Sequence, residues 1–279
     1  MLRLGTVSIA VFVAGLAAAP LAASAQGPRV VDVYSVDYAF MAPDTIAAGA
    51  TTFHLVNRGP SDHIIVLFAL PAGMSLATFD HLMRTDSTDG SGTDGTGIVK
   101  VGGPEGPPAG STESWATIDL APGRYVLTCL LALPDGSTHR MHGMFRQLTV
   151  LPASGRKTTM PHADAVVHMT DFAFDGPDSL APGRHMVRFE NAGQHPHMAI
   201  ILRLAPGKTL ADVAAWMTAP KGPAPYSAAG GTTDMAPARA SVVSLDLEAG
   251  HYLIACAATE GTAPRPHFQV GMVREFVVR

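Results

Sequence analysis

The sequence predicts an all-β protein made of two tandem β-sandwich domains, each with one short inserted helix. Three observations support this prediction. The chain of 279 residues has 28 glycines, 22 prolines and only 15% charged residues, which suits short strands and many turns. Its apolar residues follow strand-like patterns, and its sequence repeats once along its length. The formal net charge of −4 argues against a basic surface for nucleic acid.

The first 25 residues have the features of a secretory signal peptide. An apolar run from Val7 to Leu21 follows Arg3, and the small residues of 23–25 suit a signal peptidase. We therefore expect cleavage after residue 25 and a periplasmic or secreted product. A membrane anchor is the alternative, but the run is short, and no later segment is long and apolar enough to span a bilayer.

An internal repeat organises the rest of the chain. Residues 36–40 match residues 170–174, and Asp119-Leu120 matches Asp246-Leu247. The offset between the copies is 134 in the first case and 127 in the second, so short length changes separate them. The repeat predicts a first domain at 28–153, a linker at 154–162 and a second domain at 163–279, with oligomeric state left open.

Within each copy, the apolar pattern indicates strands interrupted by one helix. Val31 and Val33 alternate with polar residues, and residues 64–70 form a continuous apolar run. The same patterns predict further strands at 115–120, 125–130 and 147–150. Apolar residues at three- and four-residue spacing predict helices over 76–83 and 210–217. We expect the methionines at the ends of these helices, Met83 and Met217, to lie in the core.

Residue types that bind metals correspond between the two copies. Of twelve histidines only two pairs fall on corresponding positions, whereas both cysteines correspond, as does a pair of methionines five residues after the second histidine. Each copy therefore carries one His, Cys, His, Met set: His63, Cys129, His139, Met144 and His197, Cys256, His267, Met272. Two imidazoles, a thiolate and a weak thioether form the donor set of blue-copper sites, and they favour copper over zinc.

The predicted strands would bring each set together. Cys129 ends one predicted strand, and His139 and Met144 lie in the loop before the next. His63 directly precedes an apolar strand, so its side chain can reach the same end of the sandwich. We expect the four ligands to converge there.

The ligand segments resemble those of a known family. Residues 191–197, Asn-Ala-Gly-Gln-His-Pro-His, are similar to the first copper-ligand segment of plastocyanin-like cupredoxins, and residues 256–273 resemble their Cys, His, Met loop. The resemblance implies two Greek-key sandwiches, each with a mononuclear type 1 site formed by the four residues named above. It also implies up to two copper ions per chain, cycling between Cu(I) and Cu(II).

Two departures from the family pattern concern the ligand surroundings. Nine residues separate Cys from the second His in the first copy and ten in the second, more than in small electron carriers. Ile64 and Met198 follow the first His, where a polar residue often stands. The hydrogen bonding around the thiolate is therefore left open by the sequence.

Electron transfer with a partner protein is the leading functional expectation, with exposed apolar residues near the second His as the contact: Met141, Phe145 and Phe268. A copper carrier or storage protein is an alternative, with Met141, His142 and His195 as auxiliary ligands. Loss of metal from one copy is a further alternative, although both sets are complete.

Catalysis is the weaker interpretation. Multicopper oxidases and copper nitrite reductases need further histidines, typically including one beside the cysteine. Here Cys129 stands between Thr128 and Leu130, and Cys256 between two alanines. An oligomer with interface histidines would restore this possibility. A disulfide between the two cysteines is the structural alternative to metal binding.

Overall fold

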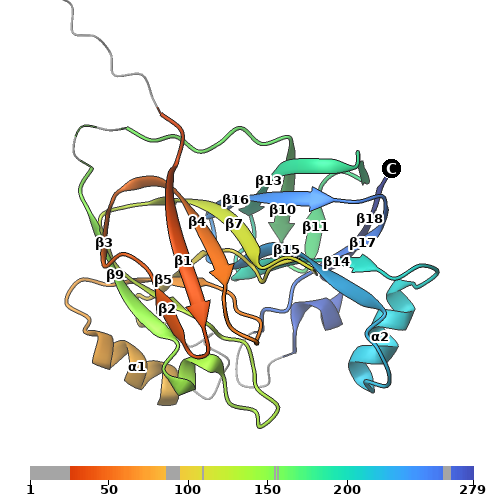
Figure 1. Cartoon of the computed structure of the whole chain (residues 1–279), viewed down its shortest axis with the longest axis horizontal. Helices are drawn as coiled ribbons and strands as arrows, with labels where there is room; N and C mark the ends of the chain where they lie inside the picture. Colours follow the sequence, from red (N-terminus) through yellow and green to blue (C-terminus); the bar gives the residue numbers. More distant parts are fainter. Residues whose placement is uncertain (1–25, 86–94, 109, 154, 156, 260–264) are drawn as a thin grey trace, which may run out of the picture.

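The computed structural model describes residues 26–85, 95–108, 110–153, 155, 157–259 and 265–279. The predicted signal peptide, residues 1–25, lies outside the described residues. The rest is dominated by strands, with the first copy of the repeat and the second copy side by side (Figure 1). No helix in the described part is long and apolar enough to cross a membrane.

The strands of the first copy are β1 (Arg29–Val36), β2 (Ala39–Met41), β3 (Thr45–Ala47), β4 (Gly49–Asn57), β5 (Val66–Leu70), β6 (Val99–Gly102), β7 (Glu113–Leu120), β8 (Gly123–Thr128) and β9 (Phe145–Leu151). Those of the second copy are β10 (Ala165–Thr170), β11 (Ala173–Asp175), β12 (Ser179–Leu180), β13 (Gly183–Asn191), β14 (His197–Leu204), β15 (Tyr226–Met235), β16 (Ala240–Leu247), β17 (Gly250–Ala255) and β18 (Val273–Val278). The helices are α1 (Leu76–Thr85) and α2 (Leu210–Thr218), and two short 3₁₀ helices are η1 (His139–His142) and η2 (His267–Val270).

Both copies have the same strand order. In the first, one sheet runs β2-β1-β4-β7 and the other β3-β9-β8-β5-β6, with β1 parallel to β4 and β3 parallel to β9. The second copy repeats this order from β11 to β16 and from β12 to β15. This is the predicted pair of Greek-key sandwiches with a cupredoxin-like fold.

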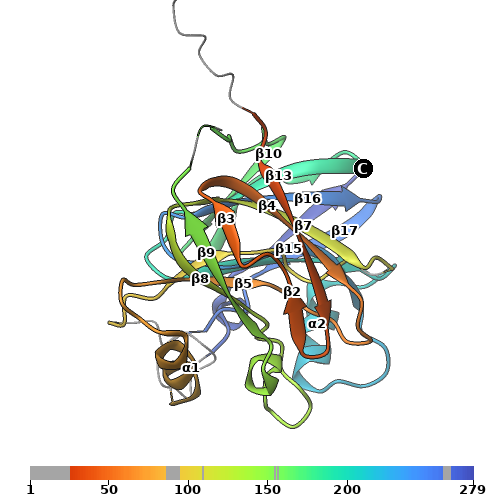
Figure 2. The ribbon, with the colours of Figure 1, turned by 60° about the vertical axis from the view of Figure 1, so that its left-hand side comes forward.

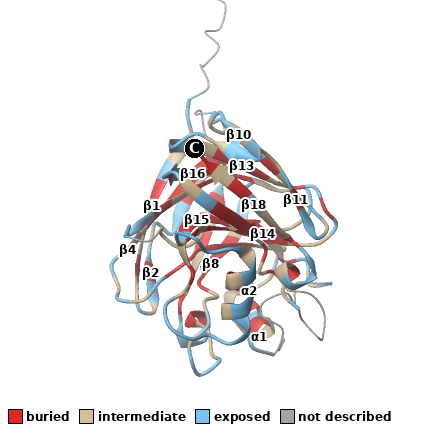
Figure 3. Ribbon diagram, turned by 90° about the vertical axis from the view of Figure 1, so that its right-hand side faces the viewer, coloured by how far each residue is buried: buried red, intermediate tan, exposed pale blue. Residues whose placement is uncertain are grey.

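The alternation predicted in the first copy is confirmed. Val31 and Val33 of β1 and Phe53 and Leu55 of β4 are buried between the two sheets. Because successive side chains of a strand point to opposite faces, their polar neighbours face outward. In both copies the buried residues lie mainly along the strands, as the red segments in Figure 3 show.

The two copies share their sheets. Strand β7 pairs with β16 and β6 pairs with β15, so the sheets run without interruption from one copy into the other. Ala116 lies directly opposite Val243, which is its own counterpart in the repeat at the offset of 127. Pairing between counterpart positions relates the copies by an approximate two-fold axis.

Buried polar groups also lie at this junction. The Nζ atom of Lys100 is 3.8 Å from an oxygen of Asp234, and both side chains are almost fully buried. The Oγ1 hydroxyl of Thr233 donates to the carbonyl oxygen of Ile65 over 2.8 Å. Strand β5 begins at Val66, later than the predicted start at residue 64, and the backbone of Ile65 instead donates to Pro104 O and accepts from Thr233.

The two predicted helices are confirmed, but they pack differently. Both lie at the same end of the molecule, and Figure 2 shows α1 beneath the strands of the first copy. Met83 is 5% exposed and packs in the core, as predicted. The prediction that Met217 is a core residue is wrong, because 43% of its surface is exposed. In α2 only Val213 is buried, so this helix contacts its sheet less closely.

Candidate metal centres

The predicted ligands of each copy stand at or beside the termini of strands and short helices, at one end of the sandwich. Cys129 directly follows β8, and Cys256 directly follows β17. His139 and His267 begin η1 and η2, and His197 begins β14. The nitrogen and sulfur ligand atoms of each His, Cys, His group lie within 4.8 Å of one another. The structure thus brings together the two histidines and the cysteine of each predicted set.

In the first centre, the Nδ1 atoms of the two histidines face each other. The distance between His63 Nδ1 and His139 Nδ1 is 3.1 Å, and Cys129 Sγ lies 3.5 Å from the latter. All three side chains are buried. Three donor atoms of the types that copper prefers therefore point at a common position shielded from water.

The second centre has nearly the same geometry. His197 Nδ1 and His267 Nδ1 are 3.1 Å apart, and Cys256 Sγ lies 3.9 Å from the first and 3.5 Å from the second. These three side chains are also buried. Neither copy has lost its arrangement of donor groups.

Backbone hydrogen bonds hold each methionine beside its cysteine. In the first copy Cys129 N donates to Met144 O over 3.2 Å, and Met144 N donates to His139 O over 3.1 Å. Met272 makes the corresponding bonds in the second copy, and both methionine side chains are fully buried. The residue before each methionine, Gly143 or Gly271, has a φ near +100°, which favours glycine and closes the loop.

Two aspartates at the centres were not predicted. His63 Nε2 lies 2.8 Å from Asp37 Oδ1, and His197 Nε2 lies 3.1 Å from Asp171 Oδ1. A carboxylate on the far nitrogen of a histidine fixes the ring and directs Nδ1 toward a metal. The sequence does contain an indication of their role, since Asp37 and Asp171 fall on corresponding positions within the best-matched segment of the repeat.

An aromatic ring covers the second histidine of each centre. The centroid of Tyr38 lies 5.0 Å from that of His139, edge to face, and Phe172 lies 5.1 Å from His267 in the same way. Tyr38 and Phe172 directly follow the two aspartates. One short segment in each copy thus supplies both the carboxylate and the ring that surround the histidines.

Backbone amides provide the hydrogen bonds around the sulfur atoms. Met198 N donates to Cys256 Sγ over 3.4 Å, and the amide of Ile64 serves Cys129 in the same way. Since these donors are backbone groups, the apolar side chains at positions 64 and 198 do not prevent the interaction.

Burial controls the protonation of the donor groups. It raises the pKa of the Cys129 thiol to about 11 and that of Cys256 to about 12, so both thiols are protonated near neutral pH without a metal. Burial also lowers the pKa of His139 and His197, which keeps these imidazoles neutral and available as ligands. A metal that binds here must displace the thiol proton.

The donor set fits copper, with up to two ions per chain. Thiolate and thioether are soft ligands, and two neutral imidazoles complete a set in which copper is preferred. The disulfide alternative is excluded, because Cys129 and Cys256 are both free. Within the described ranges, no further group of three His, Cys, Asp or Glu residues has this geometry.

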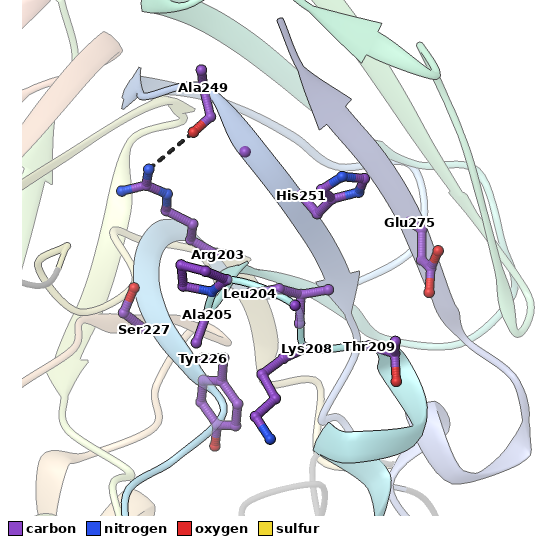
Figure 4. Close-up of a pocket in the computed structure, with 13 residues that line it drawn as sticks. Arg203, Leu204, Ala205, Lys208, Thr209, Tyr226, Ser227, Ala249, His251 and Glu275 are labelled. Carbon is purple, nitrogen blue, oxygen red and sulfur yellow. Dashed lines mark hydrogen bonds between the residues drawn. The ribbon is translucent and has the colours of Figure 1, made fainter.

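A wide surface pocket lies apart from these centres. It has a volume of about 730 Å³ and is lined by residues of β14, β15, β17 and β18 and by the loop that precedes α2 (Figure 4). The positively charged side chains that line it already have partners within the protein. Arg203 donates to Ala249 O and pairs with Glu248, and Lys208 lies 3.6 Å from Asp212. None of the predicted metal ligands lines it.

Fold and donor groups together are those of a cupredoxin-like fold, present in both copies of the repeat. No protein-family model matches the chain, and neither does any curated protein. Among solved structures, dithionite-reduced auracyanin from Roseiflexus castenholzii aligns with 41% of this chain and 94% of its own, at 16% identity and a TM-score of 0.29.

Two enzymes align over both domains. A multicopper oxidase covers 90% of this chain and 89% of its own, at 15% identity and a TM-score of 0.26. Copper nitrite reductase from Nitrosomonas europaea covers 91% and 94%, at 14% identity and a TM-score of 0.27. Because the identities and TM-scores of these alignments are low, the cupredoxin-like description of this chain rests on its strand order and on the geometry of its donor groups.

Proposed function

We propose that this chain is a periplasmic or secreted electron-transfer protein with one type 1-like copper site in each domain. The observation that carries the proposal is the buried arrangement of two opposed histidine Nδ1 atoms and one cysteine Sγ, present in both copies. The same order of donors in both copies, with a buried methionine held beside the cysteine, supports the same function. Export rests on the expected signal peptide.

The protein residues would serve this function by holding one arrangement of ligands in both oxidation states. A bound copper ion supplies one-electron chemistry between Cu(I) and Cu(II). The carboxylates of Asp37 and Asp171 orient the first histidines, and the backbone amides stabilise the thiolates. Burial excludes water from the site, so few surrounding molecules and groups have to rearrange when the charge on the copper changes.

The partner surface is proposed beside the second histidine of each centre. Met141 of η1 is 43% exposed and Val270 of η2 is 49% exposed. Each stands two or three residues after His139 or His267, so an apolar partner face could approach the ligand edge closely. Phe145 and Phe268, the other residues expected there, are half-buried.

Visible spectroscopy of the mature chain with Cu(II) tests the proposal. We expect two copper ions per chain and a strong absorption band from charge transfer between cysteine sulfur and copper. Cys129→Ser and Cys256→Ser should each remove one site and its share of the band, whereas His142→Ala and His195→Ala should leave both.

A colourless protein that holds no stoichiometric copper would overturn the assignment. Tight Cu(I) binding without a visible Cu(II) band would instead favour a carrier or storage role. More than two copper ions per chain together with turnover would favour an oxidase or reductase.

A further inference from the structure

The second domain contains an apolar cavity of about 280 Å³ between α2 and the adjacent sheet. Its lining includes Leu202 of β14, Val213 of α2 and Leu253 of β17. Tyr226 supplies the only polar side-chain atom among the lining residues. A cavity of this composition holds water poorly, because it offers few hydrogen-bond partners.

Comparison of the two copies explains the space. In the first domain Phe68 and Phe79 are fully buried, with ring centroids 5.4 Å apart, and they fill the space between α1 and β5. Their counterparts in the second domain are Leu202 and Val213. At these two positions the second domain thus has aliphatic side chains in place of phenyl rings.

A second difference affects how the helix is held. In the first domain Arg140, directly after the ligand His139, binds Asp80 and the carbonyl oxygen of Met83, which ties the ligand loop to α1. The counterparts of Arg140 and Asp80 are Phe268 and Ala214, and both line the cavity. No ionic clamp can form between these two residues, so α2 meets the ligand loop through apolar groups.

We propose that this cavity binds a small, uncharged aromatic molecule of one or two rings. Its size supports this class of ligand, because an engineered apolar cavity of about 150 Å³ already binds benzene. The vacated position of two phenyl rings gives the shape, and the lack of charged lining residues disfavours an ion. The proposal does not depend on bound metal.

Two features suggest how the ligand would sit. Burial raises the pKa of the Tyr226 hydroxyl, so it stays protonated and can donate to a polar atom on the ring. Ala255 and Ala257 flank Cys256, and Phe268 follows His267, so the ligand would lie against the segments that hold the second centre. The first domain keeps this space filled with its own side chains.

Indole, an uncharged bicyclic aromatic, is a suitable probe for the full mature chain, with and without copper. We expect saturable binding of one indole per chain by calorimetry, and nuclear Overhauser contacts from indole to the methyl groups of Leu202 and Val213. Indole-2-carboxylate, which carries a charge, should bind at least tenfold more weakly.

Restoring the rings provides the decisive variant. Leu202→Phe combined with Val213→Phe should weaken indole binding at least tenfold while leaving the copper spectrum intact. Val166→Phe, a matched change at an exposed position of β10, should bind indole like the wild type. Absence of methyl contacts in the wild type, or unchanged affinity in the double variant, would overturn the proposal. The methyl contacts are measured on the wild-type protein, so the proposal can still be tested if the double variant fails to fold.

Discussion

The hydroxyl of Thr233 donates a hydrogen bond to the carbonyl oxygen of Ile65, from the second domain to the first. Thr233 is fully buried, and Ile65 lies two residues after the ligand His63. On the other side, Met235 of the same strand pairs with the ligand His197. One buried contact therefore connects the immediate surroundings of both centres across the junction.

Thr233→Val should destabilise the whole chain by about 1–2 kcal/mol, because it removes a buried donor while keeping the side-chain shape. Urea denaturation followed by circular dichroism would measure this change as a lower midpoint. Thr233→Ser retains the hydroxyl and should lose clearly less; an equal loss in both variants would show that packing of the methyl group matters more than the bond.

Asp37→Asn should weaken copper binding at the first centre by about 10- to 100-fold, since the amide holds the His63 ring less firmly and makes it less basic. Asp171→Asn should do the same at the second centre. Competition with a Cu(I) chelator would measure both affinities. Asp32→Asn is the matched control, because Asp32 bonds His54 away from the centres; an effect as large as that of Asp37→Asn would contradict the assigned role.

Arg140→Met should lower the free energy of unfolding by about 3 kcal/mol, because it leaves Asp80 without its buried partner. Arg84→Met removes the other partner of Asp80, but Arg84 is exposed, so its loss should cost less than about 1 kcal/mol. Urea titrations of the two variants would compare these costs directly. Similar midpoints would mean that the ligand loop does not depend on its clamp to α1.

Glu105 should make stability depend on pH. Burial raises its pKa from 4.5 to about 7, and its Oε2 atom is buried without a hydrogen-bond partner. A raised pKa in the folded state contributes stability that is complete below about pH 4.5 and is lost as pH rises through about 7.

Glu105→Gln should therefore raise the melting temperature at pH 8 and change it little at pH 4.5. The corresponding gain in the free energy of unfolding at pH 8 should be about 3 kcal/mol at most. Glu275→Gln, at an exposed position, should leave the pH dependence as it is. A melting curve of Glu105→Gln that falls with pH as steeply as the wild type would contradict this account.

Several features of the fold and of the centres could be predicted because they leave a periodic or repeated trace in the sequence. The alternation around Val31 and Val33 identifies a strand with one buried face. The order Cys, His, Met from Cys129 to Met144, repeated in the second copy, identifies a loop between strands that can gather donor groups.

Other features depend on contacts between distant segments. Asp37 reaches His63 only after β1 has paired with β4, and an aspartate in a turn is too common to mark a site by itself. Met217 has the same helical spacing as Met83, but it is exposed because α2 turns only Val213 fully into the core. The continuous sheets were not predicted either, because edge pairing leaves no pattern within one strand.

The pairing of Ala116 with Val243 suggests how such a chain could have arisen. A single ancestral domain that paired with a second copy of itself through the edge strands now called β6 and β7 would form a symmetric homodimer. Joining the two genes would preserve that interface and free each half to diverge, which the clamp on one side and the cavity on the other illustrate. A domain separated from its twin would expose two unpaired sheet edges, and we expect it to dimerise again.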